Sequence, residues 1–141
     1  MRLVQVKGLD KVLNKLSRAN DKIAAGVARG LVKGGLHLQK KSMEICPVDT
    51  GNLRGSSFCR NVGGHGFSAD VVVGYTANYA VFVHEDLNKL HGRAYNEFYA
   101  ADIAAGRRAN RGENQQAKFL EKPAREERRT IIRIVQREAA F

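Results

Sequence analysis

The sequence predicts an α+β protein in which N-terminal helices and a C-terminal helix pack on one face of a small antiparallel sheet. Apolar residues recur at helical spacing near both ends of the chain, and two β-branched segments joined by a glycine-rich turn lie between them. A long loop insertion is expected at residues 86–117. The 141 residues, 43% hydrophobic and 27% charged, suit one globular domain over residues 1–141.

The first third of the chain is expected to be mainly helical. Residues 3–6 are short and apolar, which favours an edge strand or an extended arm. An amphipathic helix is predicted over residues 9–18. Asn20-Asp21 then offers a break and an N-cap for a second helix over residues 21–45. Pro47 is expected to end that helix. The apolar residues of the first helix are Leu9, Val12, Leu13 and Leu16.

Glycines inside the second helix need a physical reason, because each costs about 1 kcal/mol relative to alanine. The close approach of another backbone, from a sheet or from a neighbouring subunit, is the reason that we expect. The glycines in question are Gly26, Gly30, Gly34 and Gly35.

A β-hairpin is predicted after the long helix, with strands over residues 56–62 and 69–75 and a turn at residues 63–66. Val71, Val72 and Val73 stand in a row, which indicates a strand buried on both faces or nearly so. Residues 79–85 form a short apolar element, either a strand or a helical turn.

The rest of the chain divides into the insertion and a final helix. Within residues 86–117, aromatic spacing allows a short helix near residues 94–105. The last helix is predicted over residues 117–138, provided that Pro123 lies in its first turn.

The charge balance favours an anionic partner. Lys and Arg number 24 against 14 Asp and Glu, a net charge of +10, and residues 1–45 alone hold ten basic and three acidic side chains, +7. Nucleic acid, an acidic protein surface and a membrane face all fit such an excess. The basic residues are expected to be spread around and along the helices, as a solvated face. No aromatic residue interleaves with them between residues 1 and 57.

Membrane insertion and secretion are not expected, because no apolar run is long enough to span a bilayer and the N-terminus lacks the pattern of a signal peptide. Reduced, buried thiols are expected for Cys46 and Cys59.

Catalytic, cofactor and metal sites are not expected either. Asp49-Thr50-Gly51 matches the tripeptide of aspartic proteases, but its context favours a turn in which Asp49 bonds backbone amides. His84 and His91 are seven residues apart, which does not match the spacing of a zinc helix.

Three motifs then occur in a fixed order: PVDTGNLRGS at residues 47–56, YAVFVHE at residues 79–85 and AKFLEKPA at residues 117–124. With this series the chain resembles the tail-component or tail-completion (neck) proteins of long-tailed bacteriophages and prophages, over most of residues 8–138. The insertion at residues 86–117 is longer and more basic than the connection usual in that family. The motif positions, expected to be structural, are Pro47, Val48, Asp49, Thr50, Gly51, Leu53, Arg54, Tyr79, Ala80, His84, Glu85, Phe119, Leu120 and Pro123.

The resemblance implies a structural virion protein that forms a homo-oligomeric ring, a hexamer or a dodecamer, in the neck or tail. Its implied neighbours are head-completion or connector proteins and tail-terminator or tail-tube proteins, and a sequence-independent contact with packaged DNA is left open. The implied location is the virion, with assembly in the host cytoplasm. Candidate contacts to a neighbouring subunit or to DNA are Arg107, Arg108 and Arg111.

Two alternatives stay open from the sequence. The charge also fits a small basic nucleic-acid-binding protein, although no helix-turn-helix, stacking platform or zinc finger is visible. A small enzyme that uses the Asp49 tripeptide or histidine chemistry is the third alternative.

Overall fold

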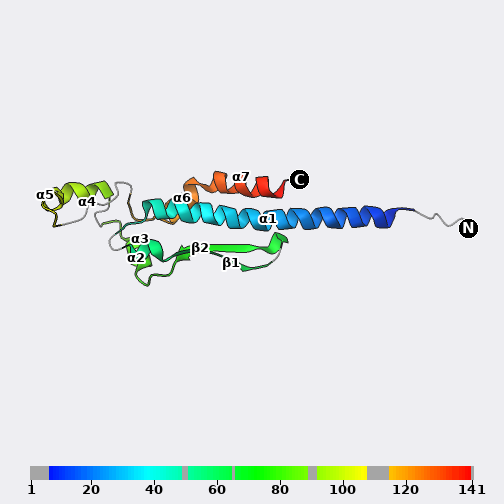
Figure 1. Ribbon diagram of the computed structural model, residues 1–141, viewed down its shortest axis with the longest axis horizontal. Helices are drawn as coiled ribbons and strands as arrows, with labels where there is room; N and C mark the ends of the chain where they lie inside the picture. Colours follow the sequence, from blue (N-terminus) through cyan, green and yellow to red (C-terminus); the bar gives the residue numbers. More distant parts are fainter. Residues whose placement is uncertain (1–6, 49–50, 65, 89–91, 108–114, 141) are drawn as a thin grey trace, which may run out of the picture.

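The computed structural model describes residues 7–48, 51–64, 66–88, 92–107 and 115–140. Its central element is α1 (Leu9–Ile45), a helix of 37 residues. The hairpin of β1 (Ser57–Gly63) and β2 (Asp70–Tyr75) lies along one side of α1, and α7 (Arg128–Ala139) lies along the opposite side (Figure 1). The predicted α+β class is confirmed, with α1 as the layer between the sheet and the C-terminal helix.

Short helices connect these elements. The predicted alternative at residues 79–85 is resolved as a helical turn, and the insertion holds two short helices where one was expected near residues 94–105. Residues 3–6, the expected strand or arm, lie outside the described residues. The connecting elements are α2 (Asn52–Gly55), the 3-10 turn η1 (Gly66–Ser68), α3 (Ala80–Glu85), α4 (Gly92–Phe98), α5 (Ala100–Ala104) and α6 (Glu121–Glu126).

The predicted break at Asn20-Asp21 is wrong, because α1 is continuous from Leu9 to Ile45. Asn and Asp each cost well under about 1 kcal/mol in a helix interior, and neither lacks the backbone N–H as proline does. Both side chains are exposed, so keeping the helix buries no polar group. The predicted end is confirmed: Cys46 is extended, with ψ 129°, directly before Pro47.

The glycines of α1 allow two other elements to approach its backbone. A Cβ on Gly30 would lie 2.7 Å from the Cα of Val135, and one on Gly26 would lie 2.4 Å from the carbonyl oxygen of Glu138, so this face packs directly on α7. A Cβ on Gly35 would lie 2.7 Å from the Sγ of Cys59 in β1. The expected close approach is confirmed, and this chain's own C-terminal helix and hairpin supply it.

The hairpin is confirmed close to its predicted bounds. Its register pairs Ser57 with Tyr75 and Cys59 with Val73, and it shifts between Asn61 and Gly63. The prediction that the valine run is buried on both faces is wrong: Val71 and Val73 are half-buried, whereas Val72 is 43% exposed. The reason is the layering, since α1 covers only one face of the two-stranded sheet.

The C-terminal helix begins later than predicted and is divided. It starts at Glu121, and α6 is followed at Glu127 by α7. Pro123 is the third residue of α6, so it lies in the first turn as predicted, where its missing N–H would have had no helical acceptor. Glu127 at the junction is held by His37 of α1, with 2.9 Å between Oε2 and Nε2.

Burial is concentrated at the C-terminal end of α1. The buried cluster there consists of Cys46, Leu53, Ala80 and Phe119. The N-terminal turns of α1 project beyond both the hairpin and α7 (Figure 1). Apolar side chains on those turns are 53–62% exposed: Leu9, Val12, Leu13 and Leu16.

Gly30→Ala is expected to destabilise the protein although alanine is the better helix former. The new methyl group would overlap the α7 backbone at Val135, and overpacking of this kind costs about 1–3 kcal/mol, more than the roughly 1 kcal/mol gained in helix propensity. Urea denaturation followed by circular dichroism measures the difference. Gly55→Ala is the matched control, because no atom of the described residues lies within 4 Å of its added Cβ. A Gly30→Ala protein more stable than the unmodified chain would contradict the packing described.

Candidate functional site

The three sequence motifs meet at one place, here called the motif junction: Cys46, Leu53, Ala80, His84 and Phe119. Leu53 lies in α2, Ala80 and His84 in α3, and Phe119 just before α6. The Phe119 side chain is 1% exposed, and its ring makes edge contacts with the rings of Tyr75 and His84, each at a centroid distance of 5.0 Å. Segments more than sixty residues apart in the sequence therefore share one small core.

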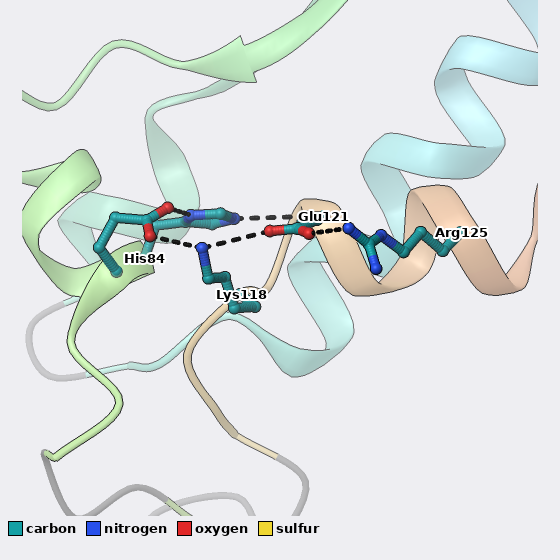
Figure 2. Close-up of polar contacts among 5 residues, drawn as sticks. His84, Lys118, Glu121 and Arg125 are labelled. Atoms are coloured by element: carbon teal, nitrogen blue, oxygen red, sulfur yellow. Dashed lines mark hydrogen bonds and ion pairs between the residues drawn. The ribbon is translucent and has the colours of Figure 1, made fainter.

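Both ring nitrogens of His84 are hydrogen-bonded, and its Nε2 links the second motif to the third (Figure 2). Its Nε2 accepts a hydrogen bond from the backbone N–H of Glu121 at 3.4 Å, so this nitrogen carries no proton. Its Nδ1–H then donates to Oε1 of Glu85 at 2.7 Å. The ring orientation is set from both sides, and the arrangement positions α3 against the start of α6.

Lys118 of the third motif also contacts the second motif. Its Nζ pairs with the carboxylate of Glu85 and lies 3.2 Å from that of Glu121, which Arg125 also holds at 2.6 Å (Figure 2). Lys118 has φ 56°, and among the described residues no other non-glycine residue has a positive φ. That conformation directs its N–H to the carbonyl of His84 at 2.8 Å. Backbone strain of this kind persists only where surrounding contacts enforce it.

The ion pairs of the junction are exposed and shift the pKa values accordingly. The hydrogen bonds from Lys118 and His84 lower the pKa of Glu85, and the bond to Glu85 raises the pKa of Lys118. Solvent screens pairs in such positions, so their contribution to stability is small. The buried aromatic contact therefore carries most of the stability of the junction.

The chain returns from the insertion to the end of α1 next to the first motif. Gln115 accepts a hydrogen bond from the N–H of Val48 at 3.1 Å, and the N–H of Gln116 donates to the carbonyl of Ile45 at 3.0 Å. Arg54 donates from Nη2 to the carbonyl of Cys46 at 3.3 Å, while its buried Nε has no hydrogen-bond partner among the described residues. These contacts fix the C-terminal end of the insertion on the core at the end of α1.

Several residues that the sequence singles out are not among those that the structure describes. Asp49 and Thr50 lie outside the described residues, as do His91, Arg108 and Arg111.

Arg107 does not reach the motif junction. Both its Nε and its Nη2 donate to Oδ1 of Asp102 in α5, at 2.9 and 2.7 Å. Its expected contact to a neighbouring subunit or to DNA stays a prediction.

The two thiols are packing groups in this structure. Cys46 is fully buried, and burial raises the pKa of its thiol to about 11. Cys59 is half-buried against Gly35, and burial raises its pKa as well. Thiols that stay protonated at neutral pH are weak nucleophiles and weak metal ligands. Within the described ranges, no three His, Cys, Asp or Glu side chains gather into a group that could hold a metal ion.

A second feature, which sequence reasoning missed, is a row of cations on α1. The basic residues were expected to spread around the helices, but that expectation is wrong because a continuous α1 brings them into phase. At 100° per residue, seven of them lie within roughly 60° of the helix circumference. We call them the basic stripe: Lys11, Lys15, Arg18, Lys22, Arg29, Lys33 and Lys40. The signal was available as their spacing of three, four and seven residues.

Comparisons with protein-family models, with curated protein sequences and with solved structures gave no match. Of the helices that the structure describes, none combines the length and apolarity needed to cross a bilayer.

Phe119→Ala is expected to lower the free energy of unfolding by about 3–5 kcal/mol, as for other buried aromatic side chains cut to alanine. Lys118→Gln removes the ion pairs of Lys118 with Glu85 and Glu121. This variant is expected to lose less than about 1 kcal/mol of the free energy of unfolding, because those pairs are exposed. Urea denaturation of the two variants decides between them. Equal losses would show that the ion pairs, not the apolar contact, hold the junction.

Alkaline pH is expected to destabilise the fold through Cys46 and Tyr75. Burial raises the pKa of Cys46 from 9.0 to about 11 and that of Tyr75 from 10.0 to about 12. The unfolded chain releases these protons first, so their stabilising effect is complete below about pH 9 and is lost as pH rises through the folded values.

Denaturation midpoints measured from pH 8 to 12 test this, using Tyr75→Phe. That variant should show a shallower fall at the upper end, whereas Tyr79→Phe, at an exposed tyrosine, should match the unmodified chain. Identical profiles for all three proteins would remove Tyr75 from the explanation.

Proposed function

We propose that the chain is a structural protein of the phage virion, which assembles as a homo-oligomeric ring in the neck or tail and completes the tail or joins it to the head connector. The observation that carries the proposal is the ordered series of three motifs and their meeting at one junction. Residues that a family shares for catalysis are expected to converge on an open pocket with reactive groups. Here the motif side chains bury Phe119 and anchor the start of α6, and the shallow hollow of about 220 Å³ beside them is lined mainly by apolar side chains.

Self-association is supported by the free end of α1. Leu9, Val12, Leu13 and Leu16 form an apolar face on turns that neither α7 nor the hairpin covers, here called the apolar strip. An exposed apolar face of this kind on a small protein marks an interaction surface. A second copy of the chain is the occupant that a ring requires, because a heterologous contact repeated around an axis closes a ring.

The rest of α1 supports the same reading. The glycine face and the hairpin face of the helix are already occupied within the chain. The covered part is therefore suited to hold the subunit together, and the projecting part is suited to reach a neighbour.

Leu13→Glu combined with Leu16→Glu is expected to abolish ring assembly without lowering the thermal stability of the single chain. Both side chains are more than half exposed, so the charges disturb a contact between copies and not the core. Light scattering coupled to size-exclusion chromatography gives the assembled mass. Val62→Glu combined with Phe67→Glu is the matched control, since it places the same two charges on apolar side chains of the hairpin that are 58% and 59% exposed.

Particles assembled with and without the chain give the decisive test. Electron microscopy of the head–tail junction should show free tails and DNA-filled heads when the chain is absent. Intact particles in its absence would overturn the proposed function, and a chain that stays monomeric at every concentration and in the presence of virion partners would overturn the ring.

A further inference from the structure

We propose that the basic stripe of α1 binds the phosphate backbone of duplex DNA without reading its sequence. The inference deepens the proposed function and rests on it for its setting, because it names the partner of one face of the ring subunit. The observation behind it is the alignment of seven cations that only the folded helix creates.

The stripe is almost purely basic. Eight positions of α1 fall in its roughly 60° sector, and seven of them are Lys or Arg, with Leu36 as the exception. All seven cations are exposed, and the acidic residues of α1, Asp10, Asp21 and Glu44, lie outside the sector. Glu138 of α7 pairs with Lys33 at 2.7 Å. Glu44, just outside the sector, interacts electrostatically with Lys40, and the seven cations still outnumber these two carboxylates.

The length of the stripe selects an extended anion. From Lys11 to Lys40 it spans roughly 44 Å at 1.5 Å per residue, more than one turn of B-DNA at about 34 Å. A free phosphate or a nucleotide could contact only one helical turn of such a row. Duplex DNA carries one negative charge per about 1.7 Å of its axis, which matches a long row of cations.

A hollow next to the stripe widens it near its C-terminal end. Lys33, Lys40 and Arg137 of α7 line this hollow of about 460 Å³ between the two helices, together with Glu138. Three cations around one concave surface can hold a phosphate group from several sides. The stripe therefore has a groove in addition to a flat row of charges.

Other polyanions fit less well. A membrane surface would need a free apolar face along the same helix, but α7 and the hairpin cover α1 beyond its first turns, whereas the stripe continues to Lys40. Single-stranded nucleic acid is held by stacking on aromatic side chains, and the first aromatic residue of the chain is Phe58. An acidic protein surface would be expected to meet an apolar centre, which the stripe lacks.

The test measures binding of the full-length chain to a fluorescent duplex of mixed sequence, several helical turns long, as a function of salt. We expect log K to fall linearly with log salt concentration. The stripe variant carries Lys15→Gln, Arg18→Gln and Arg29→Gln, and its slope should be smaller in magnitude by about 2.7, at 0.9 per lost phosphate contact. Its affinity at low salt should fall by about tenfold or more.

The control variant removes the same charge away from the stripe, through Lys41→Gln, Arg60→Gln and Lys122→Gln. It should keep the slope of the unmodified chain. Equal loss in both variants would overturn the inference, because net charge would then explain binding without the stripe. Tighter binding to single strands of the same length, or to phosphatidylserine vesicles, would overturn it as well.

The mass of each assembly, measured in parallel by light scattering, separates this inference from the proposed ring. A stripe variant that forms rings and loses DNA binding supports both proposals. DNA binding by a chain that never forms rings leaves the stripe in place and removes the ring. Rings that do not bind duplex at low salt remove the stripe alone.

Discussion

The long helix α1 is the element on which the other features depend. Glycine faces let α7 approach on one side and the hairpin on the other, and both approaches need one straight helix between them. The end of the same helix, at Cys46, supplies a wall of the motif junction. A break at Asn20-Asp21 would leave these contacts in place but would rotate the projecting turns, and the basic stripe would lose its alignment.

The covered part of α1 packs within the chain, and its uncovered part carries the surface proposed for assembly. The subunit's buried cluster is small and lies at one end, where Phe119 is enclosed by groups from all three motifs. The projecting turns carry apolar side chains that a single chain leaves in water. Full burial of such a side chain stabilises by about 1.5–3 kcal/mol, so covering them in the proposed ring would favour assembly.

Local signals were sufficient for much of the fold. Pro47 ended the helix as expected, Pro123 lay in a first turn, and the hairpin followed from its β-branched segments. The features that the sequence did not predict depend on the helical phase of α1 or on which face of the sheet α1 covers. The break was predicted from two weak helix formers, whose small cost a long helix tolerates, and the exposure of Val72 depends on which face α1 covers. The contacts of His84 with Lys118 and Glu121 link residues 34 and 37 positions apart, and local spacing in the sequence does not predict such a pairing.

The geometry of α1 also bears on how the two proposed surfaces would act together. At 100° per residue the apolar strip and the basic stripe are centred roughly 140° apart on the helix, so one neighbour and one polyanion can be engaged at once. Phosphate contacts of a single subunit are weak at physiological salt, whereas linked copies raise the effective concentration of every further contact. A ring would thus convert a modest stripe into a strong, sequence-independent grip, and the salt dependence of that grip would grow with the number of subunits that touch the duplex.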